Sequence, residues 1–270
     1  MPGNRVGVAG TAVGLEGGEE DVTGLEGLAV AGAGLVAGAV NAAVGSGSLL
    51  TFPMLLAIGY SPVLANVSNT VGLVPGSVSG AIGYRRELAG QRRRVLQLLP
   101  AAVVGGLAGG LLLLAVPGAF GTVVPILILV AVALVLLQPR VARRRRARGV
   151  IAQHPGPLLQ GGMLVCAVYG GYFGAAMSVI VLALLGLTLD DDLQRLNGLK
   201  NVFTATVNGV AAIYFALATD VAWVAVVLLW VSSAVGGQIG AHVGRRVPAP
   251  MLRLAIAVVG IAVAVKLLVD

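Results

Sequence analysis

Charged residues and cysteine are scarce in this sequence, and their scarcity excludes most classes of protein. Only 11% of its 270 residues are charged, whereas about a quarter of the residues of a soluble domain are. A single cysteine, Cys166, excludes a secreted domain held by disulfides. Gly45-Ser46-Gly47 is not followed by Lys and Ser or Thr, so it is not a phosphate-binding loop. Soluble enzymes and disulfide-rich scaffolds are therefore excluded.

What the chain does contain is apolar residues and glycine. Hydrophobic residues make up 57% and 40 residues are Gly, with a mean hydropathy of +0.96. The net charge of +7 comes from short basic clusters between apolar runs, which is typical of cytoplasmic loops and not of a nucleic-acid interface. We therefore expect an all-α polytopic membrane protein that binds no nucleic acid.

The apolar runs define the predicted helices. A membrane-spanning helix needs about 20 residues, and most runs approach that length. Two are too short, 48–59 and 177–188, so each is a broken or a re-entrant helix. The runs lie at 27–44, 48–59, 62–84, 95–116, 120–138, 157–176, 177–188, 196–218, 222–243 and 250–268.

An internal repeat relates the two short segments. Val104-Gly105-Gly106-Leu107-Ala108-Gly109 resembles Val235-Gly236-Gly237-Gln238-Ile239-Gly240, 131 residues later, and such repeats define a fold. We predict one integrated transmembrane domain of two repeats with about five hydrophobic segments each. The glycines of the repeat pack either within one chain or between two in a homodimer. The predicted parts are an extracytoplasmic disordered tail (1–24), the first repeat (25–138), a basic cytoplasmic linker (139–156) and the second repeat (157–268).

The arginines predict the orientation of the repeats. Loop 85–94 and the linker are arginine-rich and are expected to be cytoplasmic. In the second half, Arg245 and Arg246 lie in the loop equivalent to the arginine-free loop 117–121. The arginine-rich loops therefore occupy opposite positions in the two halves. This predicts inverted-topology repeats, as in secondary transporters. Both termini would lie outside the inner or plasma membrane.

The first break supplies one group of candidate site residues. Gly45 and Gly47 permit unwinding, and a short helix starting near Ser48 would direct its positive end inward, where it binds anions. The alternative is that these small residues serve close helix packing. The candidates here are Asn41, Gly45, Ser46, Gly47 and Ser48.

Polar side chains on three other predicted helices form the second group. Polar residues in a membrane span are costly and need partners. Lys200 is the one basic residue that we place at depth; the alternative is that it extends to the cytoplasmic interface. For the asparagines the alternative is structural hydrogen bonding between helices, and for Tyr172 it is core packing. These candidates are Asn66, Ser68, Asn69, Tyr172, Asn197, Lys200 and Asn201.

Several of these stretches together resemble the TauE/SafE sulfite exporter family. The resemblance rests on Gly45-Ser46-Gly47 through Pro53, Ala65-Asn66-Val67-Ser68-Asn69-Thr70, Gly170-Gly171-Tyr172-Phe173-Gly174 and Asn197-Gly198-Leu199-Lys200-Asn201. It covers about 28–268. The family usually has three glycines after the first helix, where this chain has Gly45-Ser46-Gly47-Ser48.

This resemblance implies transport of sulfite, organosulfonates or related anions. Without an ATP-binding motif, transport is passive or coupled to an ion such as a proton or sodium. No nucleophile–base pair, metal site or cofactor motif is visible, so we expect no enzyme activity and no cofactor. The alternatives are a channel or facilitator for another small anion or solute, and an accessory membrane subunit.

Overall fold

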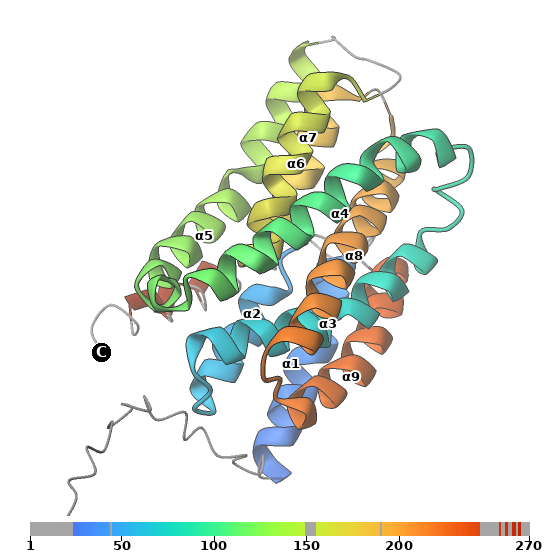
Figure 1. Cartoon of the computed structure of the whole chain (residues 1–270). Helices are drawn as coiled ribbons and strands as arrows, with labels where there is room; N and C mark the ends of the chain where they lie inside the picture. The colour runs from blue at the N-terminus through green and yellow to red at the C-terminus, as the bar shows by residue number, and fades with distance from the viewer. Residues whose placement is uncertain are drawn as a thin grey trace, which may run out of the picture.

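The computed structural model describes residues 24–43, 45–148, 155–189 and 191–243, with seven further residues between 254 and 265. The described chain is helical (Figure 1). Most of the predicted tail and last segment, and Asp190, Arg245, Arg246 and Lys266, lie outside the described residues. The helices are α1 (Gly24–Ala43), α2 (Ser48–Ala57), α3 (Pro62–Gly83), α4 (Arg92–Ala115), α5 (Pro117–Arg148), α6 (Pro157–Tyr172), α7 (Met177–Thr188), α8 (Leu193–Ala218) and α9 (Trp223–Val243).

The predicted all-helical membrane class agrees with these helices. Four of them are long and apolar enough to cross a membrane, namely α1, α4, α8 and α9. Large apolar side chains such as Leu111, Ile126 and Leu217 lie exposed on the surface, which suits contact with lipid and not with water. The two short predicted segments are the helices α2 and α7, with 10 and 12 residues.

Local signals in the sequence explain where several helices begin. Ser61 precedes α3, and its hydroxyl accepts a hydrogen bond from the backbone N–H of Leu64, with Pro62 at the first helical position. Asp192 caps α8 in the same way through the N–H of Gln194. The predicted linker begins inside α5, which continues to Arg148, because Ala and Arg favour the helix after the apolar run ends.

The halves pack crosswise, so that helices of the first half lie against helices of the second half. Helix α1 packs on α9 and α4 packs on α6, and α3 and α8 contact each other at the centre. In Figure 1, α1 rises from the lower end to the middle of the bundle, whereas α6 descends to the middle from the upper end. Helices α1 and α6, which begin the two predicted repeats, therefore run in opposite directions in this view.

Glycines allow these helices to touch backbone to backbone. A Cβ atom on Gly109 of α4 would lie 2.1 Å from the carbonyl oxygen of Val168 in α6. A Cβ atom on Gly240 of α9 would lie 2.2 Å from the carbonyl oxygen of Ala39 in α1. Gly109 and Gly240 are equivalent in the repeat, so both halves use the same small-residue contact. Of the two predicted alternatives, the structure has these glycines packing within the chain.

Candidate functional site

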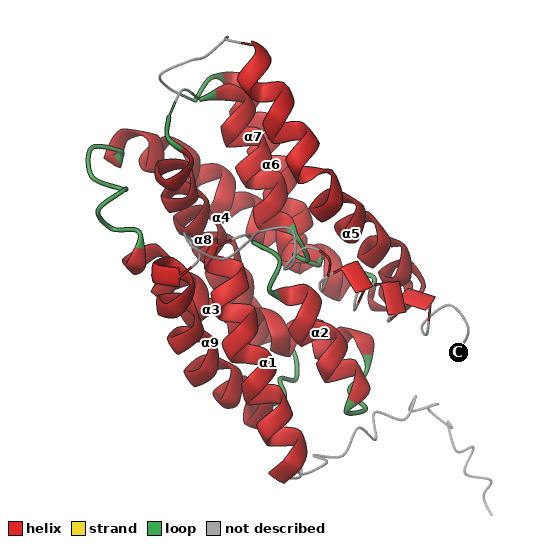
Figure 2. Cartoon of the chain, turned by 180° about the vertical axis from the view of Figure 1, so that it is seen from behind, coloured by secondary structure: helices red, strands yellow, loops and turns green. Residues whose placement is uncertain are grey.

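A break separates α1 from α2 in the middle of the bundle, where Figure 2 shows loop segments away from both ends. Gly45 has a φ of +98°, and its N–H donates to the carbonyl of Val40 at 2.9 Å. This hydrogen bond and the left-handed glycine end the helix. A Cβ atom on Gly47 would lie 2.3 Å from the Ala37 carbonyl oxygen. Glycine is therefore required at both positions.

At the break between α6 and α7, the first helix ends in the same way. Gly174, 129 residues after Gly45, has a φ of +74°, and its N–H donates to the carbonyl of Tyr169 at 3.1 Å. Ala176, just before α7, is also left-handed, with a φ of 57°. This conformation costs a residue with a Cβ atom about 1–2 kcal/mol, so Ala176 occupies a position that favours glycine.

The two breaks are in contact. A Cβ atom on Gly45 would lie 2.3 Å from the Cβ atom of Ser178, in the first turn of α7. The hydroxyl of Ser178 lies 3.0 Å from that of Thr204 in α8. The unwound backbone of one half thus meets the start of the short helix of the other half.

Helix α8 supplies the groups that cap the end of α1. The Lys200 Nζ donates to the carbonyls of Asn41 at 3.0 Å and Ala42 at 3.1 Å, and the Asn201 Nδ2 donates to Ala42 at 3.3 Å. The C-terminal end of a helix is partly negative and favours a cation. Lys200 is fully buried, so its side chain points into the bundle and does not extend to the surface of the protein.

Helix α3 contacts the end of α6 from the other side. The Asn66 Nδ2 donates to the Tyr172 carbonyl at 3.0 Å. Asn69 accepts a hydrogen bond from the Thr51 hydroxyl of α2. Each break is therefore capped by the polar central helix of the opposite half.

The other predicted site residues divide into two groups. Ser46 and Asn197 are buried, and the Ser46 Oγ, Asn66 Oδ1 and Asn197 Oδ1 atoms have no hydrogen-bond partner. Buried polar atoms of this kind need a ligand or water to compensate them.

In the second group, Ser68 and Tyr172 make structural contacts. The Ser68 hydroxyl accepts from the Ala222 N–H before α9. The ring of Tyr172 packs against Phe120 at 5.5 Å, so its carbonyl, and not its ring, faces Asn66. Ser48 is the half-buried first residue of α2.

Some polar residues at the breaks were not predicted. Besides Thr51, these are Ser77, whose hydroxyl accepts from the Asn41 Nδ2 at 3.2 Å, and the Ser178–Thr204 pair. Thr51 follows Ser48 by three residues, a spacing that puts both on one helix face and could have indicated it. Ser77 carries no such signal.

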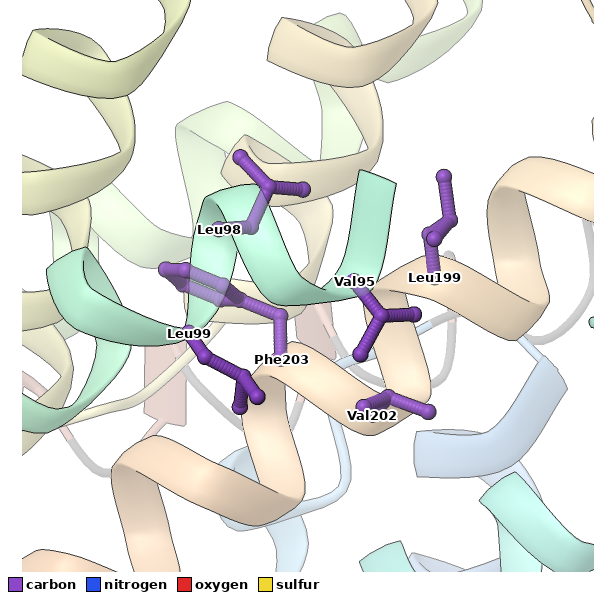
Figure 3. A pocket seen from close by; sticks show the side chains of 6 residues that line it. All are labelled: Val95, Leu98, Leu99, Leu199, Val202 and Phe203. Carbon is purple, nitrogen blue, oxygen red and sulfur yellow. The ribbon is translucent and has the colours of Figure 1, made fainter. Parts of the chain in front are cut away.

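The polar groups at the two breaks are closed off from solvent. Lys200, Asn66 and Asn201 are at most 2% exposed. One pocket between α4 and α8 is lined only by apolar residues, and none of the predicted site residues lines it (Figure 3). It offers nothing to an anion, whereas the breaks contain buried hydrogen-bond donors. The lining residues are Val95, Leu98, Leu99, Leu199, Val202 and Phe203.

An ion-pair cluster joins the halves at the arginine-rich end. Asp191, before α8, pairs with Arg94 of α4 and with Arg195 at 2.8 Å. Gln91 donates to the Arg195 carbonyl at 3.0 Å, and Arg195 donates to the carbonyl of Ala89 at 3.2 Å. This ion-pair cluster links the start of α4 and the residues before it to the start of α8.

The cluster also determines how Asp191 titrates. Partial burial alone would raise the pKa of Asp191. Hydrogen bonds from Arg94 and from the Asp192 N–H, with the charges of Arg195 and Arg94, lower this pKa below its ordinary value of 3.8. Asp191 is therefore a carboxylate at neutral pH, and the cluster is ionic.

Among the described residues, no group of three or more His, Cys, Asp or Glu side chains could hold a metal ion. No Asp or Glu is among the fully buried residues of the described chain. The buried chemistry at the breaks therefore consists of one ammonium, amides, hydroxyls and backbone groups. Such a set of donors recognises an oxyanion through charge-assisted and neutral hydrogen bonds.

Apolar helices that could span a membrane surround the buried polar residues of the two breaks, which is typical of a membrane protein. Sequence comparisons identify its family. Residues 30–267 match the family described as sulfite exporter TauE/SafE. The chain belongs to this family.

Curated relatives carry transporter names. The chain is 28% identical to the "Probable membrane transporter protein YfcA" of Escherichia coli strain K12, over 87% of each chain. It is 25% identical to a "Probable membrane transporter protein" of Haemophilus influenzae, over 88% of this chain and 92% of the relative. No solved structure matches the chain. The protein is a membrane transporter by family and by relatives.

Proposed function

We propose that this chain carries small sulfur-containing oxyanions, such as sulfite or organosulfonates, across the inner or plasma membrane by alternating access without ATP. The observation that carries the proposal is the meeting of two helix breaks around the buried Lys200. Two N–H groups of Lys200 are used on the end of α1, and an ammonium has three. The third is free to bind an anion.

Backbone and amide donors complete the proposed site. Among the described residues, none accepts from the N–H groups of Gly47 and Ser48 at the start of α2. The positive end of that helix adds to the attraction for an anion. Asn201 lies beside Lys200, and Ser46 contributes a buried hydroxyl without a partner. An oxyanion would exchange its water shell for these donors.

The inverted repeat supports a carrier mechanism. Crosswise packing, equivalent glycine contacts and opposite helix directions agree with two inverted halves. Inverted repeats with broken helices at midplane are the architecture of carriers that rock around a central site. The polar residues where the two breaks meet are closed off from solvent, which favours a carrier over the alternative of a permanently open channel.

Uptake into proteoliposomes tests this proposal. Saturable sulfite flux that shows counter-exchange is the expected result. Lys200→Met should reduce it at least tenfold, because the only buried cation of the described site is lost. Gly209→Ala, on the same helix with nothing within 4 Å of the added Cβ atom, is the matched control and should keep the flux. Flux without saturation would favour a channel, and no flux of any sulfur anion would refute the proposed substrate.

A further inference from the structure

In both breaks a glycine with positive φ ends the first helix, but the two breaks differ in charge. At the end of α1, the Lys200 ammonium binds two carbonyl oxygens. The position equivalent to Lys200 in the first half is Asn69, 131 residues earlier. Asn69 is neutral and accepts from Thr51. The end of α6 therefore has the same partial negative charge as the end of α1 without a lysine to compensate it.

Several oxygen atoms at this end of α6 accept no hydrogen bond from any side chain that the structure describes. The carbonyls equivalent to those held by Lys200 belong to Gly170 and Gly171, and no side chain of the described residues donates a hydrogen bond to either. Asn66 donates to the neighbouring Tyr172 carbonyl. Its own Oδ1 is buried and has no partner, in a side chain that is 1% exposed. Leaving such an acceptor unsatisfied costs about 1–3 kcal/mol.

We propose that a monovalent cation, sodium in the first place, binds at the end of α6 through the Asn66 Oδ1 and the last carbonyls of the helix. The ion takes the place that the Lys200 ammonium has at the end of α1. Unwound carbonyls and helix C-terminal ends hold such ions in other transporter architectures. A divalent ion does not fit, because its sites need carboxylates and no Asp or Glu is fully buried among the described residues.

The role of this ion in transport rests on the proposed function, although its binding does not. Lys200 and the cation would stand at the two breaks, with the anion between them. Both positive charges then compensate the negative substrate in a region of low dielectric constant. A proton is a poorer candidate for this place, because amide and carbonyl oxygens do not hold one near neutral pH.

Thermal unfolding of the purified full chain tests ion binding without any substrate. The salts compared are sodium, potassium and choline chloride at equal concentration. Sodium about tenfold above its Kd should raise Tm by about 3–6 °C over choline. A rise in potassium alone would keep the site and change the ion. Equal Tm values in all three salts would overturn the proposal.

Variants locate the ion. Asn66→Ala should lose the sodium-dependent shift, and Asn69→Lys should lose it because a tethered ammonium replaces the ion. Asn197→Ala, the equivalent change in the other half, should keep the shift. Asn66→Asp retains an oxygen ligand and should enlarge it, which covers the case that Asn66→Ala does not fold. A shift that persists in Asn66→Ala would overturn the assignment. Sodium binding without sulfite flux would refute only the proposed function.

Discussion

Gly109 is where an added methyl group should most clearly separate the two halves. In Gly109→Ala the new Cβ atom would lie 2.1 Å from the Val168 carbonyl oxygen and 2.6 Å from the Tyr172 nitrogen. A carbon and a carbonyl oxygen normally approach to about 3.3–3.6 Å. Both neighbours are backbone atoms of α6, so no side chain can rotate away. Helices α4 and α6 must therefore move apart by about 1 Å.

The magnitude follows from two opposing effects. Overpacking costs up to about 3 kcal/mol, whereas alanine gains about 1 kcal/mol over glycine in a helix. The net loss is about 2 kcal/mol, which lowers Tm by about 4–8 °C for a chain of this size. Gly240→Ala, which meets the Ala39 carbonyl oxygen at 2.2 Å, should cost about the same.

Thermal unfolding in detergent, followed by circular dichroism, measures this effect. Gly209→Ala is the control, because a Cβ atom there has nothing within 4 Å. It should be at least as stable as the unaltered chain. If Gly109→Ala unfolds at the same temperature as Gly209→Ala, the backbone contact between the halves is refuted.

Three further predictions concern the ion-pair cluster, the second break and the orientation. Because the folded-state pKa of Asp191 is lowered, the ionised Asp191 stabilises the folded chain fully above pH 3.8. This stabilisation is lost as the pH falls through the lowered pKa. The Tm difference between the unaltered chain and Asp191→Asn should shrink over that range, and a constant difference would contradict an ionic cluster. Ala176→Gly relieves a left-handed alanine and should raise Tm by about 2–4 °C; an unchanged or lower Tm would argue against strain there. A reporter at the C-terminus should be external and one in loop 85–94 cytoplasmic, and reporters on the same side would contradict the inverted repeats.

The sequence predicted the elements of this fold better than their contacts. Glycines, short apolar runs and a repeated spacing predicted one break at Gly45 and Gly47 and another before the short segment 177–188, because local backbone geometry is encoded locally. The burial of Lys200 followed from its place in an apolar run. The extension of α5 to Arg148 was not predicted, because arginine was read as a sign of a loop and is also a good helix former.

Contacts between distant residues could not be predicted from one sequence. That α8 caps α1 and α3 caps α6 depends on how the two halves pack. Ser68 and Asn66 are two residues apart and were similar candidates. One supports the start of α9 and the other contacts a break, because residues at i and i+2 lie on different faces of a helix.

The central claim is that the site where the two breaks meet binds the substrate and opens alternately to the two sides of the membrane. Thiol labelling of Ser46→Cys in a Cys166→Ala background tests it most directly, because Ser46 lies at the first break with a buried hydroxyl. A reagent that cannot cross the membrane should label the new cysteine from either side, and an organosulfonate, which does not react with thiol reagents, should protect it from both. Labelling from one side only, or labelling that the organosulfonate leaves unchanged, would contradict a substrate site with alternating access where the two breaks meet.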